Sequence, residues 1–100
     1  MPTPRFSFRA EVWEHDGTAA WFFVSVPTSV ADDIAELSLG RERGFGSVRV
    51  EATIGATRWC TSLFPDGGRG TYVLPLKRAV RLAEDLAPGS TAHVTLTVVG

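Results

Sequence analysis

The chain has 100 residues, 44% of them hydrophobic, and its ten basic and eleven acidic side chains give a net charge of −1. This length predicts a single domain over residues 1–100, and three tryptophans with six phenylalanines exclude a disordered chain. The charge balance provides no overall positive field, which argues against nucleic acid as a partner.

The N-terminal quarter of the chain has the pattern of a β-hairpin. Apolar and polar side chains alternate over residues 6–15, the period of a half-buried strand. Asp-Gly-Thr at 16–18 is typical of a tight turn, and residues 19–26 form a second apolar strand. Trp21 and Phe23 lie on one face of this strand, and the opposite face comprises Phe22, Val24 and Val26. We therefore expect both faces to be covered.

A helix is expected after Pro27, which removes a hydrogen-bond donor from the strand. Ser29 is placed to cap its first turn, with Asp32 three residues later as in a capping box. The helix should end near Leu37, and its apolar stripe consists of Val30, Ile34 and Leu37. Glycines and charges over residues 40–46 then predict a loop.

The middle of the chain predicts a second hairpin. Residues 48–54 alternate between apolar and polar, Gly55-Ala56 is a plausible two-residue turn, and residues 57–64 form the returning strand. Pro-Asp-Gly-Gly at 65–68 is expected to break the chain, and residues 71–74 are read as a short fifth strand.

The C-terminal quarter predicts a helix and a final strand. Pro75 suits a first helical position, and the helix should end at Pro88-Gly89. Its apolar stripe consists of Leu76, Ala79, Val80, Ala83 and Leu86. Residues 91–99 alternate and are rich in β-branched side chains, as in a strand.

The predicted fold is therefore mainly β with two helices, in the order ββαβββαβ. Six strands joined mostly by short antiparallel connections hide their edges best by closing, so we expect a small closed or split β-barrel. An open α+β sheet is the alternative.

Four stretches carry a resemblance to a known family: WFFVSVP at 21–27, GFGSVRVEATIG at 44–55, W-x-TSLFP at 59–65 and YVLPLKRAVRLAEDL at 72–86. Together they resemble domain-of-unknown-function family 1905 over nearly the whole chain. The resemblance implies a double-split β-barrel and no established activity. Members often precede a region similar to bacteriocin-protection proteins. This sequence lacks that region, which leaves its partner, if any, in trans. The position after the first tryptophan of W-x-TSLFP is commonly basic in the family and is Cys60 here.

The charge order of the predicted second helix is reversed relative to the helix dipole. Lys77 and Arg78 stand at its start, where carboxylates are favoured, and Glu84 and Asp85 stand near its end. In one interpretation Lys77 and Arg81 form ion pairs with these acids or with those of the first helix. In the other, the free N–H groups of the helix start and nearby cations hold an anion. The candidate ligand-binding residues are Arg58, Thr61, Ser62, Tyr72, Lys77 and Arg81.

Other chemistry finds less support. Cys60 lacks a base placed by any motif, since His15 lies beside a turn and His93 in a strand, so we expect it to be a partly buried strand residue. Two histidines and one cysteine fall short of a metal set, and we predict no catalytic residue, metal or cofactor. Asp-Gly-Gly-Arg-Gly at 66–70 precedes a strand rather than a helix, which favours a hairpin turn over a phosphate loop.

The function that these residues favour is a non-catalytic module that binds a small anionic ligand or a protein partner. A nucleic-acid-binding dimer, by analogy with other split barrels, is the alternative, and an enzyme ranks third. At least two of Trp13, Trp21, Trp59 and Tyr72 should lie in the core, while Trp13 is a candidate for a groove or a dimer contact, so the chain is either a monomer or a homodimer. A single cysteine and the absence of a leader or membrane segment predict a cytoplasmic location.

Overall fold

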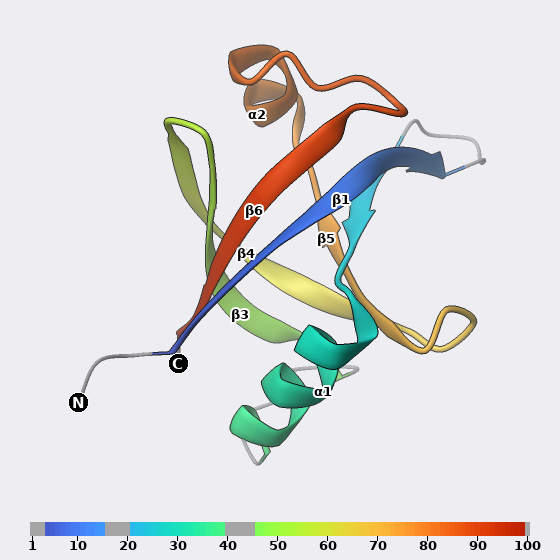
Figure 1. Cartoon of the computed structure of the whole chain (residues 1–100), viewed down its shortest axis with the longest axis vertical. Helices are drawn as coiled ribbons and strands as arrows, with labels where there is room; N and C mark the ends of the chain where they lie inside the picture. The colour runs from blue at the N-terminus through green and yellow to red at the C-terminus, as the bar shows by residue number, and fades with distance from the viewer. Residues whose placement is uncertain (1–3, 16–20, 40–45, 100) are drawn as a thin grey trace.

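All the paired strands of this computed structural model are antiparallel, and six strands close into a barrel in the order β1-β2-β5-β4-β3-β6 (Figure 1). The structure describes residues 4–15, 21–39 and 46–99. The elements are β1 (Arg5–His15), β2 (Trp21–Ser25), α1 (Thr28–Leu37), β3 (Val48–Ile54), β4 (Thr57–Asp66), β5 (Thr71–Pro75), α2 (Arg78–Ala83) and β6 (Thr91–Val98). The mainly β class and the order ββαβββαβ are confirmed, and the barrel is closed. The double-split arrangement implied by the resemblance stays a prediction.

Strict alternation along the strands builds the core. Every second residue of β3 from Val48 to Ile54 is buried, as is every second residue of β6 from Ala92 to Val98. The register sets Ala52 opposite Trp59, so a small side chain faces the largest one. Full burial of a valine, leucine or isoleucine side chain contributes about 1.5–3 kcal/mol to the stability of the fold. The barrel interior is therefore a packed core rather than a channel.

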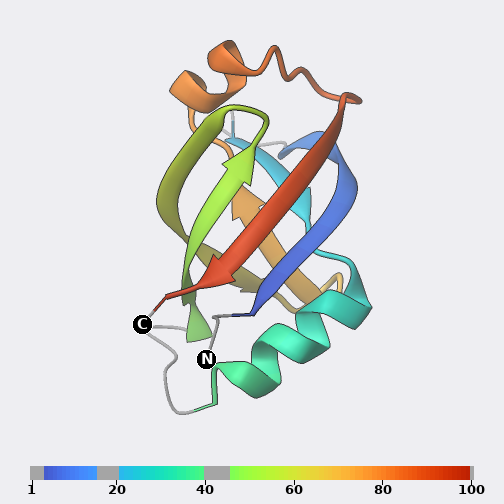
Figure 2. The ribbon, with the colours of Figure 1, turned by 60° about the vertical axis from the view of Figure 1, so that its left-hand side comes forward.

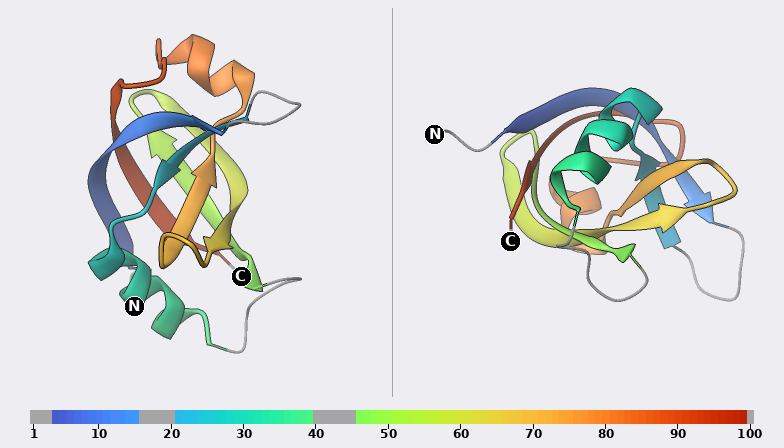
Figure 3. Two further views of the ribbon diagram at one scale, coloured as in Figure 1. Left: turned by 90° about the vertical axis from the view of Figure 1, so that its right-hand side faces the viewer. Right: turned by 90° about the horizontal axis from the view of Figure 1, so that it is seen from below.

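The two helices lie at opposite ends of the barrel (Figures 2 and 3). α1 packs against one end through Ala31 and Ile34, and α2 lies at the other end with Val80 buried. Ion pairs between the acids of α1 and the bases of α2 are therefore geometrically impossible.

The predicted cap of one helix and the predicted end of one strand, both at prolines, are wrong. α1 begins at Thr28 with Pro27 at the N-cap position and no side-chain cap, so Ser29 does not cap it. The Pro27 carbonyl instead accepts a hydrogen bond from the N–H of Ala31 over 2.8 Å. β4 does not break at Pro65 but continues to Asp66.

The second helix is shorter than predicted, running only over Arg78–Ala83. Pro75 is the last residue of β5 rather than the first of the helix, because the N–H of Leu76 donates to the carbonyl of Phe22 over 2.8 Å and extends the ladder with β2. The chain then leaves the helix at Asp85, which has a positive φ of 53°. Pro88-Gly89 therefore lies well beyond the end of α2.

The predicted turn at 16–18 and most of the predicted loop at 40–46 fall outside the described residues. None of the helices in the described ranges has the length and apolar character needed to cross a membrane. The cytoplasmic location stays a prediction.

Candidate functional site

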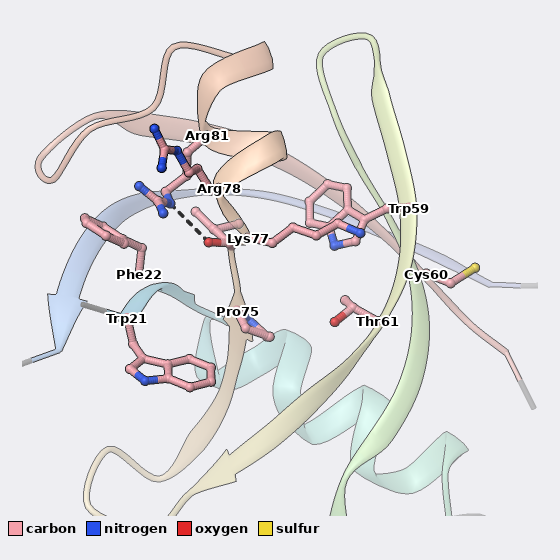
Figure 4. Close-up of a pocket in the computed structure, with 10 residues that line it drawn as sticks. Trp21, Phe22, Trp59, Cys60, Thr61, Pro75, Lys77, Arg78 and Arg81 are labelled. Atoms are coloured by element: carbon pink, nitrogen blue, oxygen red, sulfur yellow. Dashed lines mark hydrogen bonds between the residues drawn. The ribbon is translucent and has the colours of Figure 1, made fainter. Parts of the chain in front are cut away.

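A cavity lies where β4 and β5 diverge. These strands pair only between the last residues of β4 and the first of β5, at Phe64↔Val73, Pro65↔Tyr72 and Asp66↔Thr71. Within the described residues, the earlier part of β4 thus has no strand partner on this side. The space between it and the start of α2 is a cavity of about 410 Å³, which we call the β4–α2 cavity (Figure 4). It is lined by Trp21, Phe22, Trp59, Cys60, Thr61, Pro75, Leu76, Lys77, Arg78 and Arg81.

Three cationic side chains face this cavity, and none of the described residues that line it is acidic. Lys77 and Arg78 are exposed, and Arg81 is half-buried. In the part of the chain that the structure describes, the one ion pair joins Arg69 to Asp66, on a different turn. The interpretation that Lys77 and Arg81 are neutralised by nearby carboxylates is therefore wrong. The three positive charges stand together without an acidic partner among the described residues.

Neutral groups hold Arg81 in place. Its Nε donates to the carbonyl of Leu76 over 3.2 Å, and its guanidinium carbon lies 3.9 Å from the centroid of the Phe22 ring. A guanidinium carries five N–H donors, so four are left after this bond. The side chain is therefore fixed in position while its charge stays available.

The reversed charge order of the second helix is weaker than the sequence indicates. Lys77 occupies the N-cap and Glu84 the C-cap of a six-residue helix, so of the four residues in question only Arg78 lies inside α2. Glu84 instead accepts a hydrogen bond from the Thr57 hydroxyl over 2.6 Å. The cations are better understood as part of the cavity than as part of a helix terminus.

The rest of the cavity wall is apolar and aromatic. Trp59 is 9% exposed, whereas Trp21 is 54% exposed. Alternation along β4 turns Trp59 and Thr61 toward the cavity and Cys60 outward, and Figure 4 shows the Cys60 thiol pointing away from the space that Thr61 faces. The prediction that Cys60 is partly buried is wrong, because the thiol is exposed on the outer face of the strand.

The fold brings together three of the six candidate ligand-binding residues. Thr61, Lys77 and Arg81 all line the β4–α2 cavity. Thr61 comes from the part of β4 that pairs with β3 but not with β5, and the two cations come from the N-cap and the last turn of α2.

The other three candidates lie elsewhere. Arg58 lines a separate polar hollow of about 610 Å³ on the outer face of the barrel together with Glu51. Ser62 shares that outer face, opposite Arg49 in the register. Tyr72 lies beside α1, at the other end of the barrel. A single site containing all six residues is not formed.

Phe22, Pro75 and Arg78 line the cavity as well, although they are not among the six candidate ligand-binding residues. The register between β2 and the end of β5 brings Phe22 beside α2. The position of Arg78 next to Lys77 in a basic run is the sequence signal that could have identified it.

A second group of aromatic side chains lies on the outer face of β1 and β2. The ring centroids of Trp13 and Phe23 are 5.0 Å apart, and those of Trp21 and Phe23 are 6.2 Å apart with an interplanar angle of 9°. The guanidinium carbon of Arg69 lies 4.0 Å from the centroid of the Trp13 ring. Trp21 therefore borders both this outer aromatic group and the β4–α2 cavity.

The turn predicted at 66–70 is confirmed, and the side chain of its first residue, Asp66, stabilises it. Asp66 Oδ1 accepts hydrogen bonds from the N–H groups of Gly68 and Arg69 over 3.1 and 3.3 Å. Its Oδ2 lies 3.1 Å from Nε of Arg69. These bonds place Arg69 over Trp13 and leave the turn on the outside of the barrel.

Within the described ranges, no three or more His, Cys, Asp or Glu side chains are grouped so that they could hold a metal ion. No curated protein matches the sequence. The family model described as "Domain of unknown function (DUF1905)" matches residues 8–96. The chain, a six-stranded barrel with a cationic and aromatic cavity, thus belongs to the family Domain of unknown function (DUF1905).

Proposed function

We propose that this chain is a non-catalytic binding module whose β4–α2 cavity takes up a small anionic ligand. The observation that carries the proposal is the grouping of Lys77, Arg78 and Arg81 around one concave site in which none of the described lining residues is acidic. Like charges repel, and a bound anion relieves this repulsion.

The geometry supports binding in two further ways. A cavity of about 410 Å³ falls within the usual range for small-molecule sites, roughly 300–1,000 Å³. Leu76 and Phe22 hold Arg81 in place before any ligand binds, so the Arg81 side chain loses little conformational entropy on binding. The Thr61 hydroxyl adds a neutral hydrogen-bonding group from the opposite wall (Figure 4).

The same arrangement supports binding rather than catalysis. The Cys60 thiol points away from the cavity, and neither His15 nor His93 lines it. A nucleophile and a base within hydrogen-bonding reach of each other are the minimum for covalent catalysis. None of the described lining residues forms such a pair.

A protein partner is the second candidate, and the outer group of the exposed Trp21 with the half-buried Trp13 and Phe23 favours it. Aromatic side chains are enriched at protein interfaces. Such a partner would cover the outer face of β1 and β2 and, through Trp21, also reach one wall of the cavity. The nucleic-acid alternative has no comparable support in a chain of net charge −1.

The test is a titration with inorganic phosphate and with 2-naphthoate, followed by amide NMR and calorimetry. We expect the amide signals of Thr61 and of residues 77–81 to shift at millimolar ligand. Replacing both exposed cations, in the variant Lys77→Gln/Arg78→Gln, should weaken 2-naphthoate binding about tenfold, since exposed ion pairs contribute about 0.2–1 kcal/mol each.

The matched control is Arg49→Gln/Arg58→Gln, which removes the same charge from the exposed outer face of β3 and β4. This variant should bind 2-naphthoate as the unmodified protein does. Equal weakening by both double variants would show a diffuse charge effect and refute the site. The absence of any shift near residues 77–81 would refute the function.

A further inference from the structure

We infer that the ligand of the β4–α2 cavity is a planar aromatic anion whose ring stacks on the indole of Trp21 while its anionic group is held by Lys77, Arg78 and Arg81. This inference rests on the proposed function and names its ligand class. It requires that an aromatic surface in the cavity be open, flat and fixed in orientation.

The open aromatic surface is that of Trp21. The ring of Phe22 is already covered by the Arg81 guanidinium, 3.9 Å from its centroid, and Trp59 is only 9% exposed. Trp21 is 54% exposed and lines the cavity. Of the aromatic rings among the described lining residues, it is thus the one with the most surface left for a ligand.

The orientation of the Trp21 ring is set by a neighbour outside the cavity. Phe23 stacks nearly parallel to it, with an interplanar angle of 9° and centroids 6.2 Å apart. A supported indole loses little conformational freedom when a second ring binds. Trp21 is therefore a preformed stacking surface.

Charge and ring lie on the same side of the cavity, which defines the shape of the ligand. In Figure 4 the guanidinium groups of Arg78 and Arg81 lie above Trp21, and Lys77 extends across toward β4. A ligand that lies on the indole thus directs its anionic end toward the start of α2. An aliphatic anion would pair with the cations but would not stack on the indole ring.

The size of the cavity sets the size of the ligand. A cavity of roughly 150 Å³ suffices for benzene, so about 410 Å³ admits one or two fused rings with an anionic group. A polynucleotide does not fit this space, whereas an aromatic carboxylate or a nucleoside monophosphate has the required chemistry. Both join a planar aromatic ring to an anionic group, and the experiment distinguishes them.

The experiment compares two carboxylates of matched charge and size by calorimetry: 2-naphthoate, which is planar and aromatic, and decahydro-2-naphthoate, its saturated counterpart. Aromatic stacking adds about 0.5–1.5 kcal/mol beyond area burial. We therefore expect 2-naphthoate to bind about two- to tenfold more tightly than decahydro-2-naphthoate. Adenosine monophosphate is measured alongside, and its rank relative to 2-naphthoate shows which of the two compound classes the cavity prefers.

The variant Trp21→Leu keeps an apolar side chain but removes the ring. It should lower the affinity for 2-naphthoate to that of decahydro-2-naphthoate and leave the saturated acid unchanged. The control is Trp13→Phe, an outer aromatic residue that does not line the cavity, and it should change neither affinity. Because Trp21 is more than half exposed, its replacement should preserve the fold, which far-ultraviolet circular dichroism verifies.

The outcomes separate the inference from the function on which it rests. If the two acids bind equally and Trp21→Leu weakens neither or both alike, the aromatic class is refuted while anion binding stands. If neither acid, nor adenosine monophosphate, nor inorganic phosphate binds, the proposed function itself is refuted.

Discussion

A hydrogen bond joins Thr57, the first residue of β4 after the β3–β4 turn, to Glu84 at the end of α2, and the absence of a side chain at Gly55 leaves room for it. The Thr57 hydroxyl donates to Glu84 Oε2 over 2.6 Å. Gly55, in the same turn, has a φ of 59°, and a Cβ built on it would overlap the Glu84 carboxylate. We predict that Gly55→Ala forces the Glu84 side chain to rotate away and breaks its bond to Thr57.

The cost of this substitution has two parts. Placing an alanine in the left-handed region costs about 1–2 kcal/mol. Loss of the hydrogen bond to a half-buried carboxylate adds about 1 kcal/mol, the typical net contribution of one intramolecular hydrogen bond. The free energy of unfolding should therefore fall by about 2–3 kcal/mol. For a domain of this size the melting temperature should fall by about 10–20 °C.

Urea unfolding of a double-mutant cycle separates the two parts. Glu84→Ala alone should cost about 1 kcal/mol, and adding Gly55→Ala to it should cost only the backbone part, about 1–2 kcal/mol. The coupling energy is then about 1 kcal/mol. Thr57→Ser, which keeps the hydroxyl, should preserve this coupling, whereas Thr57→Val should abolish it. An equal cost of Gly55→Ala with and without the Glu84 side chain would refute the reasoning.

Two further predictions concern the outer surface. Asp66→Ala removes the hydrogen bonds and the ion pair that hold the turn at 66–70 and should lower the free energy of unfolding by about 1 kcal/mol. Because Arg69 then leaves the Trp13 ring, tryptophan emission should shift to the red, and Arg69→Ala should reproduce that shift. Unchanged emission in both variants would contradict the stacking of Arg69 on Trp13. The Cys60 thiol should react rapidly with Ellman's reagent in the folded protein, and Cys60→Ser should leave 2-naphthoate affinity unchanged. Slow labelling or a loss of binding would place this thiol inside the cavity rather than outside it.

Much of the barrel follows from local sequence patterns. Alternation over 48–54 and 91–99 marks which residues of β3 and β6 enter the core. The Gly55-Ala56 turn follows from a glycine at a position that needs a positive φ. These signals are carried by neighbouring residues, so the sequence alone determined the six strands, the two helices and their order.

The same alternation explains why the candidate site was only partly predicted. Arg58 and Ser62 share the outer face of β4 with Cys60, whereas Thr61 shares the inner face with Trp59. This alternation can be read from the sequence, and it places Arg58 and Ser62 on the opposite face of β4 from Thr61. Tyr72 could not be excluded in this way, because its distance from the cavity depends on where β4 and β5 stop pairing.

Only the tertiary structure decided where α2 begins and what faces it. Local chemistry favours a helix from Pro75, but the bond from the N–H of Leu76 to the carbonyl of Phe22 keeps the chain extended for two more residues. That bond joins residues far apart in the sequence and forms only when β2 and β5 become neighbours in the closed barrel. Long-range strand pairing thus outweighs local helix propensity at the start of α2. The sequence by itself determined which side chains are basic and which are aromatic. Closure of the barrel determined that Trp21 and the cations at α2 line one cavity.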